Sequence, residues 1–458
     1  MSQRQFSLNA FIPATGHHVA AWRHPDAAAD GGHDLQHYVR VAQAAEAAKF
    51  DGVFLADSAA VWGGAGVGGT DRQGLEALSR SARGAHFEPI TLLSALAAVT
   101  ERIGLIATVT TTYNEPFHLA RKFASLDWLS NGRAGWNLVT SANQHEAPNF
   151  GLDAHVEHAD RYQRAEEFID VVKGLWDSWE DDAFQRDKDS GVYFDPDKLH
   201  TLHHRGAHFK VRGPLNVARP PQGYPVLVQA GSSEPGKELA ARTAEVIFTA
   251  QQTLADAQAF YADVKGRLAR YGRSPDSLKI LPGVFPVVGR TEAEAREKFE
   301  ALQNLIDPKV GLALLSGMIG GFDLSAYPVD GPLPELPASN GGKSRQALLI
   351  DKARREGLTI RQLYLSIAGA RGHWQVVGSA EQVADRLQAW FEQGAADGFN
   401  LMPPVLPTGL DDFIELVLPI LRERGLFRSE YQGRTLREHL GLSRPDNHHA
   451  ARRNRAAA

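Results

Sequence analysis

Three polar side chains interrupt or end apolar stretches, and their positions indicate a ligand pocket. Asp57 ends the short apolar run 52–57, while Thr108 and Asn137 lie within the apolar segments 103–110 and 134–140. A polar side chain in an apolar core needs a hydrogen-bonding partner, and a bound ligand can supply one. A solvated loop carboxylate is the alternative for Asp57, but an acid at the carboxyl end of a barrel strand more often belongs to the active-site face.

A turn rich in small and hydroxyl residues follows the apolar run 226–229. Its residues are Ala230, Gly231, Ser232 and Ser233, after which Glu234 and Pro235 open a helix. Backbone N–H groups and hydroxyls at a helix N-terminus form a binding site for an anion. An ordinary serine N-cap is the simpler alternative. In a barrel, however, phosphate sites commonly lie in the later βα loops, which favours an anion-binding role for this turn.

Two adjacent histidines, His17 and His18, follow the first expected strand. They are either surface loop residues or neutral imidazoles that donate a hydrogen bond or move a proton. Only one can face a ligand, because neighbouring side chains in an extended segment diverge, and His17 is narrowly favoured. A metal site is not indicated, since His203 and His204 are also adjacent and no H-E-x-x-H motif occurs.

The segment 64–69 matches the dinucleotide pattern G-x-G-x-x-G. That fingerprint requires a strand that ends at the first glycine and a helix that begins there. Here the glycines lie beyond the end of the apolar run at Asp57, and Thr70 to Gly74 follow them. A surface loop is therefore the preferred interpretation.

Composition excludes several classes of protein. The 458 residues include no cysteine, which rules out disulfides, thiolate metal sites, Fe–S clusters and cysteine nucleophiles. The net charge of -5 provides no field that would attract nucleic acid or an anionic membrane. No stretch approaches 18 uninterrupted apolar residues, as a membrane span requires. The first residues lack the apolar core of a signal peptide, so we expect a cytoplasmic enzyme.

Short apolar runs alternate with amphipathic stretches about eight times along the chain, and this pattern predicts a fold. Parallel strands joined by helical crossovers produce such alternation, and eight repeats favour a closed (β/α)8 TIM barrel over an open sheet. The expected strands are 6–13, 52–57, 103–110, 134–140, 226–229, 246–248, 280–288 and 399–402. The expected helices are 34–50, 89–100, 115–129, 160–179, 235–243, 292–305, 380–393 and 410–424.

Three segments interrupt the alternation, namely 58–88, 180–224 and 306–374. Long insertions in a compact domain are usually lids or binding loops, and we expect them at the C-terminal face of the barrel. Residues 323–340 are proline-rich and should be irregular. A single domain over 1–444 with a disordered tail at 445–458 is therefore expected.

Nine segments, in order, carry a resemblance to a known family. They are 8–25 (LNAFIPATGHHVAAWRHP), 52–57, 88–105, 110–121 (TTTYNEPFHLAR), 126–137 (LDWLSNGRAGWN), 139–151, 158–168, 208–216 and 228–233. The chain resembles flavin-dependent monooxygenases of the nitrilotriacetate, pristinamycin and dibenzothiophene-sulfone monooxygenase group, within the bacterial-luciferase-like superfamily. The resemblance spans residues 6 to 440, although the segments after Asp57 and at 306–374 follow no family pattern.

The resemblance implies a (β/α)8 enzyme that uses reduced FMN, supplied by a separate NAD(P)H:flavin reductase, together with O2. It implies that Asp57, Thr108 and Asn137 surround the isoalloxazine ring. His158, Tyr162, Ser232 and Ser233 would lie nearer the ribityl chain and phosphate, and His17 or His18 near the reacting face.

The expected substrate is a small organic compound attacked at a C–S, C–N or C–H centre. The family also implies a homodimer or homotetramer, formed through the helices at 89–100 and 115–129. Two alternatives stay open: a barrel oxidoreductase that transfers hydride from a deazaflavin, and a flavin-binding protein without catalysis.

Overall fold

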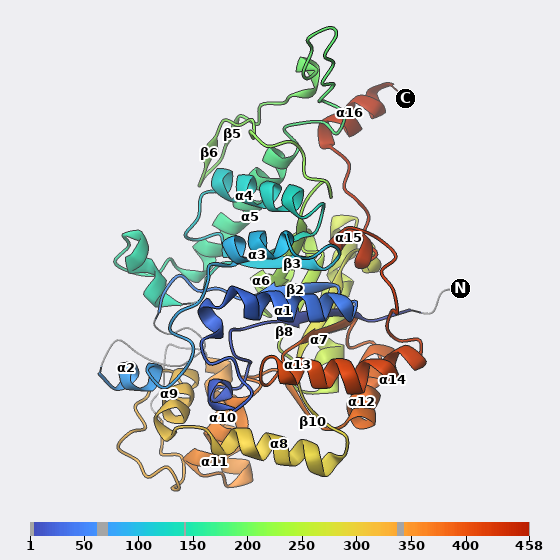
Figure 1. Cartoon of the computed structure of the whole chain (residues 1–458). Coiled ribbons are helices and arrows are strands. Elements are labelled where there is room, and N and C mark those ends of the chain that lie inside the picture. The colour runs from blue at the N-terminus through green and yellow to red at the C-terminus, as the bar shows by residue number, and fades with distance from the viewer. Residues whose placement is uncertain (1–3, 62–71, 142, 337–342, 458) are drawn as a thin grey trace.

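Eight parallel strands close into a barrel (Figure 1). The computed structural model describes residues 4–61, 72–141, 143–336 and 343–457. β1 pairs with β2 and β11, and the pairing of β8 with β9 closes the ring. The barrel strands are β1 (Ser7–Phe11), β2 (Gly52–Leu55), β3 (Gly104–Thr110), β4 (Ala134–Val139), β7 (Val226–Ala230), β8 (Val246–Thr249), β9 (Lys279–Gly289) and β11 (Gly398–Leu401). The expected (β/α)8 barrel is thus confirmed.

The strands are buried on both faces, as parallel barrel strands must be. Aromatic side chains fill the interior: Phe11, Phe54 and Phe248 contact one another edge to face, with ring centroids 5.0 to 5.5 Å apart. Such pairs add stabilisation beyond their buried area. These rings form an apolar layer in the same part of the barrel as the candidate site.

Helices cover the outside of the barrel. They are α1 (Leu35–Ala47), α3 (Pro89–Ala97), α4 (Pro116–Leu129), α5 (His158–Trp176), α6 (Glu234–Thr243), α7 (Leu254–Arg267), α8 (Glu292–Asn304), α12 (Ala380–Glu392), α13 (Thr408–Asp412) and α14 (Leu418–Glu423). The last two are joined by a π-helical turn (Phe413–Val417). Proline 419 explains this turn, because proline cannot donate the α-helical hydrogen bond. The 3₁₀ segments are Ala21–Arg23, Gly31–His33, Gln144–Phe150, Pro196–Lys198, Leu268–Tyr271 and Pro275–Ser277.

Two of the insertions meet beside the loop that follows β1. They contribute α2 (Arg72–Leu78), α9 (Pro308–Met318), α10 (Lys343–Glu356) and α11 (Ile360–Ala368), which gather at one end of the molecule in Figure 1. Arg80 forms an ion pair with Asp307 at 3.1 Å, and the indole N–H of Trp22 donates to the carbonyl of Arg80. The two insertions therefore form one cap, which has its own small hydrophobic core.

An additional strand, β10 (Trp374–Ser379), lies outside the barrel and pairs in parallel with the second half of β9. The sequence interpretation missed it, because it assigned no element to the few residues between the insertion 306–374 and the helix expected at 380–393. The fingerprint-like glycines at 64–69, and part of the proline-rich segment 323–340, lie outside the described residues.

The insertion 180–224 has a different position from the one expected. It follows α5, and its hairpin of β5 (His204–Arg205) and β6 (Lys210–Val211) lies along the side of that helix. Glu167 of α5 accepts hydrogen bonds from His204 Nε2 and from the backbone N–H groups of His208 and Phe209. This insertion supports the outside of the barrel instead of covering the C-terminal face.

The tail also differs from the expectation of disorder. Residues 448–457 form α16 (His448–Ala457). Asn447 donates to the carbonyls of Asp177 and Trp179, and the ring of His448 lies 2.8 Å from a carboxylate oxygen of Asp177. These contacts to the residues that directly follow α5 hold the tail against the barrel, which a polar composition alone did not indicate.

Candidate functional site

Thr108 and Asn137 lie side by side inside the barrel. They occupy paired positions on β3 and β4, and Asn137 Nδ2 donates to Thr108 Oγ1 at 2.8 Å. Both side chains are buried. Asn137 Oδ1 has no hydrogen-bond partner within the described part of the chain. A buried acceptor without a partner is unfavourable unless a ligand or water satisfies it.

The turn after β7 forms a small cradle at the N-terminus of α6. Ser233 caps the helix, accepting from Gly236 N, and its hydroxyl lies 3.3 Å from the hydroxyl of Tyr162. A Cβ atom at Gly236 would lie 3.0 Å from both of these hydroxyl oxygens. Gly231 has a positive φ of 129°, which side-chain-bearing residues rarely adopt. The backbone therefore approaches closely here and leaves room for an anion.

The other residues predicted for this region lie around the cradle. Ala230 ends β7 and Ser232 is exposed in the turn. His158 is the first residue of α5, and its ring centroid lies 4.9 Å from that of Tyr162. The structure thus brings Tyr162 and His158 to the turn that holds Ser233.

Asp57 lies just beyond β2, at the mouth of the barrel. Its carboxylate is 3.3 Å from Nε2 of His86, a residue of the first insertion. No hydrogen bond joins Asp57 to Thr108 or Asn137 among the described residues. Asp57 therefore belongs to the rim of the candidate site, while the other two residues lie deeper.

His17 is buried and has a partner at each ring nitrogen. Nε2 lies 3.0 Å from the carbonyl oxygen of Phe11, and Nδ1 lies 3.0 Å from Nη2 of Arg371. A carbonyl oxygen can only accept and a guanidinium can only donate. Nε2 therefore carries the proton and Nδ1 the lone pair.

His18 is also buried, and it points to different partners. Its Nε2 lies 3.0 Å from Oε1 of Gln303, and its Nδ1 accepts from the backbone N–H of Ala20. Burial lowers the pKa of His18 to about 4, and burial together with Arg371 lowers the pKa of His17 well below its usual value. Both rings are neutral at pH 7. The expectation of a histidine donating to a ligand does not fit this arrangement, because neither ring has a free N–H group.

The sequence analysis missed three basic residues that lie near His17 and the barrel mouth. Arg371 and His373 come from the turn between α11 and β10, and Arg83 comes from the first insertion. The ring of His373 stacks on Phe248 inside the barrel, with centroids 4.9 Å apart and planes 6° apart. Arg83 donates to the backbone carbonyl of His17 at 2.9 Å. Their segments have no regular apolar period. The run Arg371-Gly372-His373 was the only sequence signal for two of them, and Arg83 had none.

Glu146 is another residue that the sequence did not reveal. Its buried carboxylate accepts from Ser58 Oγ at 2.8 Å, from Ala59 N at 3.2 Å and from Ser141 Oγ. It thereby joins the loops that follow β2 and β4. This contact fixes the entrance of the barrel next to Asp57.

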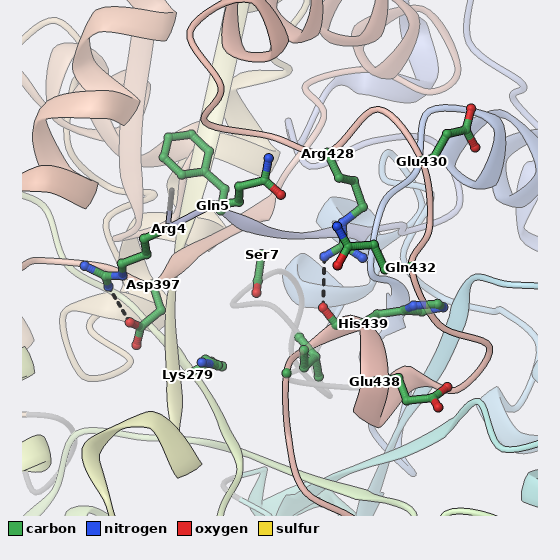
Figure 2. A pocket seen from close by; sticks show the side chains of 13 residues that line it. Arg4, Gln5, Ser7, Lys279, Asp397, Arg428, Glu430, Gln432, Glu438 and His439 are labelled. Carbon is green, nitrogen blue, oxygen red and sulfur yellow. Dashed lines mark hydrogen bonds and ion pairs between the residues drawn. The ribbon is translucent and has the colours of Figure 1, made fainter. Parts of the chain in front are cut away.

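A cavity of about 280 Å³ lies at the opposite end of the barrel from these residues. Figure 2 shows Ser7, Lys279 and Asp397 around it, which lie where β1, β9 and β11 begin. Arg4 pairs with Asp397 at 2.5 Å, and Arg428 donates to the carbonyl of His439. Enzymes of this fold place their chemistry at the C-terminal ends of the strands, so this cavity at the amino end is not the candidate site.

Comparisons with known proteins identify the family of this chain. The family model described as luciferase-like monooxygenase matches residues 15–397. The chain belongs to the luciferase-like monooxygenase family. Nitrilotriacetate monooxygenase component A of Aminobacter aminovorans is 55% identical over 449 residues, covering 97% of this chain and 98% of that protein.

Two further similarities extend over nearly the whole chain. N-acetyl-S-(2-succino)cysteine monooxygenase of Bacillus subtilis (strain 168) is 54% identical over 450 residues, covering 98% of this chain and 99% of that protein. The crystal structure of the riboflavin lyase RcaE, with modified FMN and the substrate riboflavin, has a TM-score of 0.84 and 35% identity, covering 98% of this chain and 99% of that one.

Family membership makes this luciferase-like protein an oxidoreductase of the monooxygenase type. None of the helices in the described ranges has the length and apolar character that a membrane span requires. The candidate site lies where the family's fold places its chemistry.

Proposed function

We propose that the enzyme uses reduced FMN and O2 to oxygenate or cleave a small organic compound, and that a separate NAD(P)H:flavin reductase supplies the reduced FMN. The observation that supports this cofactor is the presence of two features in one barrel. One is an anion-binding cradle at Ser233, and the other is Asn137 Oδ1, a buried acceptor without a hydrogen-bond partner among the described residues. The flavin in the similar RcaE structure supports FMN. The name "component A" of one relative supports a separate partner protein.

The residues present fit this cofactor. Ser233, Tyr162 and the N-terminus of α6 would hold its phosphate, because hydroxyls and free N–H groups bind dianions there. Thr108 and Asn137 would hydrogen bond to polar atoms of the ring. When bound, the reduced flavin supplies the electrons that activate O2. The cap of α2, α9 and α11 would exclude water from the reacting centre.

Titration with flavin tests the binding part of the proposal. Fluorescence quenching should show tighter binding of reduced than of oxidised FMN, with O2 consumption recorded in parallel. Consumption of a reduced deazaflavin in place of reduced FMN would favour the hydride-transfer alternative. Binding without O2 uptake beyond that of free reduced flavin would favour a non-catalytic flavin-binding protein.

We expect His17→Ala to uncouple the reaction. His17 holds Arg371 at the barrel mouth through Nδ1, so its loss should lower product per reduced flavin by about tenfold, with H2O2 rising to match. This is less than the effect of roughly 10²–10⁴-fold that is typical of a group that transfers a proton. FMN affinity should be unchanged, because the cradle lies elsewhere. His18→Ala is the matched control, since His18 contacts Gln303 instead. Equal product yields in both variants and the parent would contradict this positioning role.

Assembly into a homodimer or homotetramer is also proposed. Val99, Trp128 and Leu129 lie at neighbouring ends of the α3 and α4 segments, and their exposed fractions are 41%, 47% and 62%. Exposed apolar side chains that gather in one place are typical of interfaces. Mass photometry at micromolar concentration should therefore show a species of at least twice 50.0 kDa. A single 50 kDa species would refute this proposal.

A further inference from the structure

Two arginines come from distant parts of the chain to the same side of the barrel mouth. Arg83 belongs to the insertion after β2, and Arg371 precedes β10. His17 links them, since its backbone carbonyl accepts from Arg83 Nη2 at 2.9 Å and its Nδ1 accepts from Arg371 Nη2 at 3.0 Å. One histidine from the β1 loop thus positions both guanidinium groups.

Neither arginine has a counter-charge among the described residues. Two arginines that are buried elsewhere have one: Arg219 forms ion pairs with Asp177 and Asp181, and Arg437 with Glu245. Arg133, which is also buried, has none within the described ranges, but it donates to four backbone carbonyls instead. Arg83 and Arg371 form no ion pair with any described residue. An unpaired charge is costly to remove from water, and the cost rises when a second like charge lies nearby.

Most of the N–H donors on the two guanidinium groups also have no partner in the described part of the chain. Each guanidinium has five N–H donors in a planar fork. Within the described ranges each makes one hydrogen bond, to His17, and Nε of Arg371 is buried without a partner. Proximity of Arg371 adds to burial in lowering the pKa of Arg83, and burial lowers the pKa of Arg371 to about 10. Arg371 is therefore still charged at neutral pH.

The backbone at Arg371 is held in an unfavourable conformation. Its φ is 50°, in the left-handed region, which costs about 1–2 kcal/mol for a residue with a side chain. Such strain persists where the surroundings determine the geometry, and it gathers at ligand-binding positions. The strain is another sign that this side chain has a specific place to occupy.

We propose that Arg83 and Arg371 together bind a carboxylate group of the substrate, so that the enzyme acts on a small organic acid. Planar forks of N–H donors match a carboxylate in two-point hydrogen bonds. The phosphate of FMN would lie at the cradle of Ser233, on the turn after β7, and not beside the loop after β1. This inference rests on the proposed function only in taking the ligand to be the compound that is oxygenated.

The test measures binding to the flavin-free protein, so that it does not depend on turnover. Calorimetry is performed with nitrilotriacetate, citrate and succinate as probes, and separately with FMN. The parent should bind at least one of the acids, and Arg83→Gln and Arg371→Gln should weaken that binding by about 10–100-fold, as expected for hydrogen bonds to a charged group. FMN affinity should stay within about twofold, a difference small on the scale of binding energies.

Arg296→Gln is the matched control. It removes one positive charge from an exposed position on α8, where Arg296 pairs with Glu292, and it should leave binding of the acid unchanged. Arg83→Lys and Arg371→Lys are measured as well, in case the glutamine variants do not fold. They retain the charge but lose the planar fork, and we expect about 3–10-fold weaker binding.

Three results would overturn the proposal. The parent could bind none of the acids while O2 uptake with reduced FMN is intact, which would leave the proposed function standing without a carboxylate site. The arginine and control variants could bind the acid as tightly as the parent. The arginine variants could lose affinity for FMN while keeping that for the acid, which would assign the pair to the flavin phosphate.

Discussion

Replacing Ser233 by aspartate is expected to weaken FMN binding by about 100-fold or more, equivalent to about 2.8 kcal/mol. Aspartate is a good N-cap, so the variant retains the hydrogen bond that Ser233 accepts from Gly236 N and the start of α6. It places a negative charge, however, where the phosphate dianion is expected. Two unit charges about 4 Å apart repel by about 4 kcal/mol at an effective dielectric constant of 20. Equilibrium titration followed by flavin fluorescence measures the change.

Ser233→Asn separates the charge from the shape of the side chain. Asparagine caps helices as well as aspartate does and carries no charge, so FMN affinity should fall far less than in the aspartate variant. Riboflavin, which has no phosphate, should bind the parent and both variants alike. Equal losses of FMN affinity in the two variants would show that the phosphate does not lie at this helix.

Replacing Arg133 by methionine is expected to lower the free energy of unfolding by about 3–5 kcal/mol, because several buried carbonyls, each worth about 1–3 kcal/mol when left unsatisfied, lose their donor. The Arg133 guanidinium is buried between α3, β3 and β4. It donates to the carbonyls of Ala97, Thr100, Ile103 and Ser130 at 2.7 to 3.1 Å. Ala97 is the last residue of α3 and Thr100 follows it, and the carbonyls at the end of a helix lack partners within the helix. Methionine fills a similar volume but leaves these buried oxygens unpaired.

Urea and thermal unfolding followed by circular dichroism measure this loss. Arg296→Met is the control, because Arg296 lies exposed on α8 and pairs with Glu292 four residues away, a contact worth about 0.3–0.5 kcal/mol. A loss below about 1 kcal/mol for Arg133→Met, no larger than that of an ordinary hydrogen bond, would mean that water or a local shift satisfies the carbonyls.

The barrel could be predicted from the sequence because its strands are buried on both faces. Continuous apolar runs such as 134–140 and 103–110 contrast sharply with the amphipathic helices between them. The added strand β10 could not be predicted in the same way. Only two of its six residues are buried, since it pairs with β9 at the outside of the barrel.

The ordered tail illustrates another limit. The composition of residues 445–458 is that of a disordered segment, yet Asn447 and His448 hydrogen bond to Asp177. Those partners lie 270 residues away in the sequence, so no local pattern could reveal them. Long-range polar contacts of this kind decide the order of a segment without leaving a periodic signal.

The candidate site was predictable where residue type and strand position act together. Asn137 and Thr108 were found because a polar residue within an apolar strand requires a partner, and the structure pairs them at 2.8 Å. The role of His17 could not be read in this way. Its partner Arg371 lies 354 residues away, and only that contact shows that both of its ring nitrogens are engaged.

We propose that this enzyme couples the oxidation of reduced FMN by O2 to oxygenation of an organic compound. The most direct test is the yield of H2O2 per reduced FMN oxidised, measured with the protein in excess, without substrate and then with each of a panel of small organic acids, amines and sulfur compounds. We expect a yield near one without substrate and a clear fall with at least one compound, with oxygenated product appearing in the same amount. A yield that stays near one with every compound, and a rate of flavin oxidation equal to that of free reduced FMN, would contradict it.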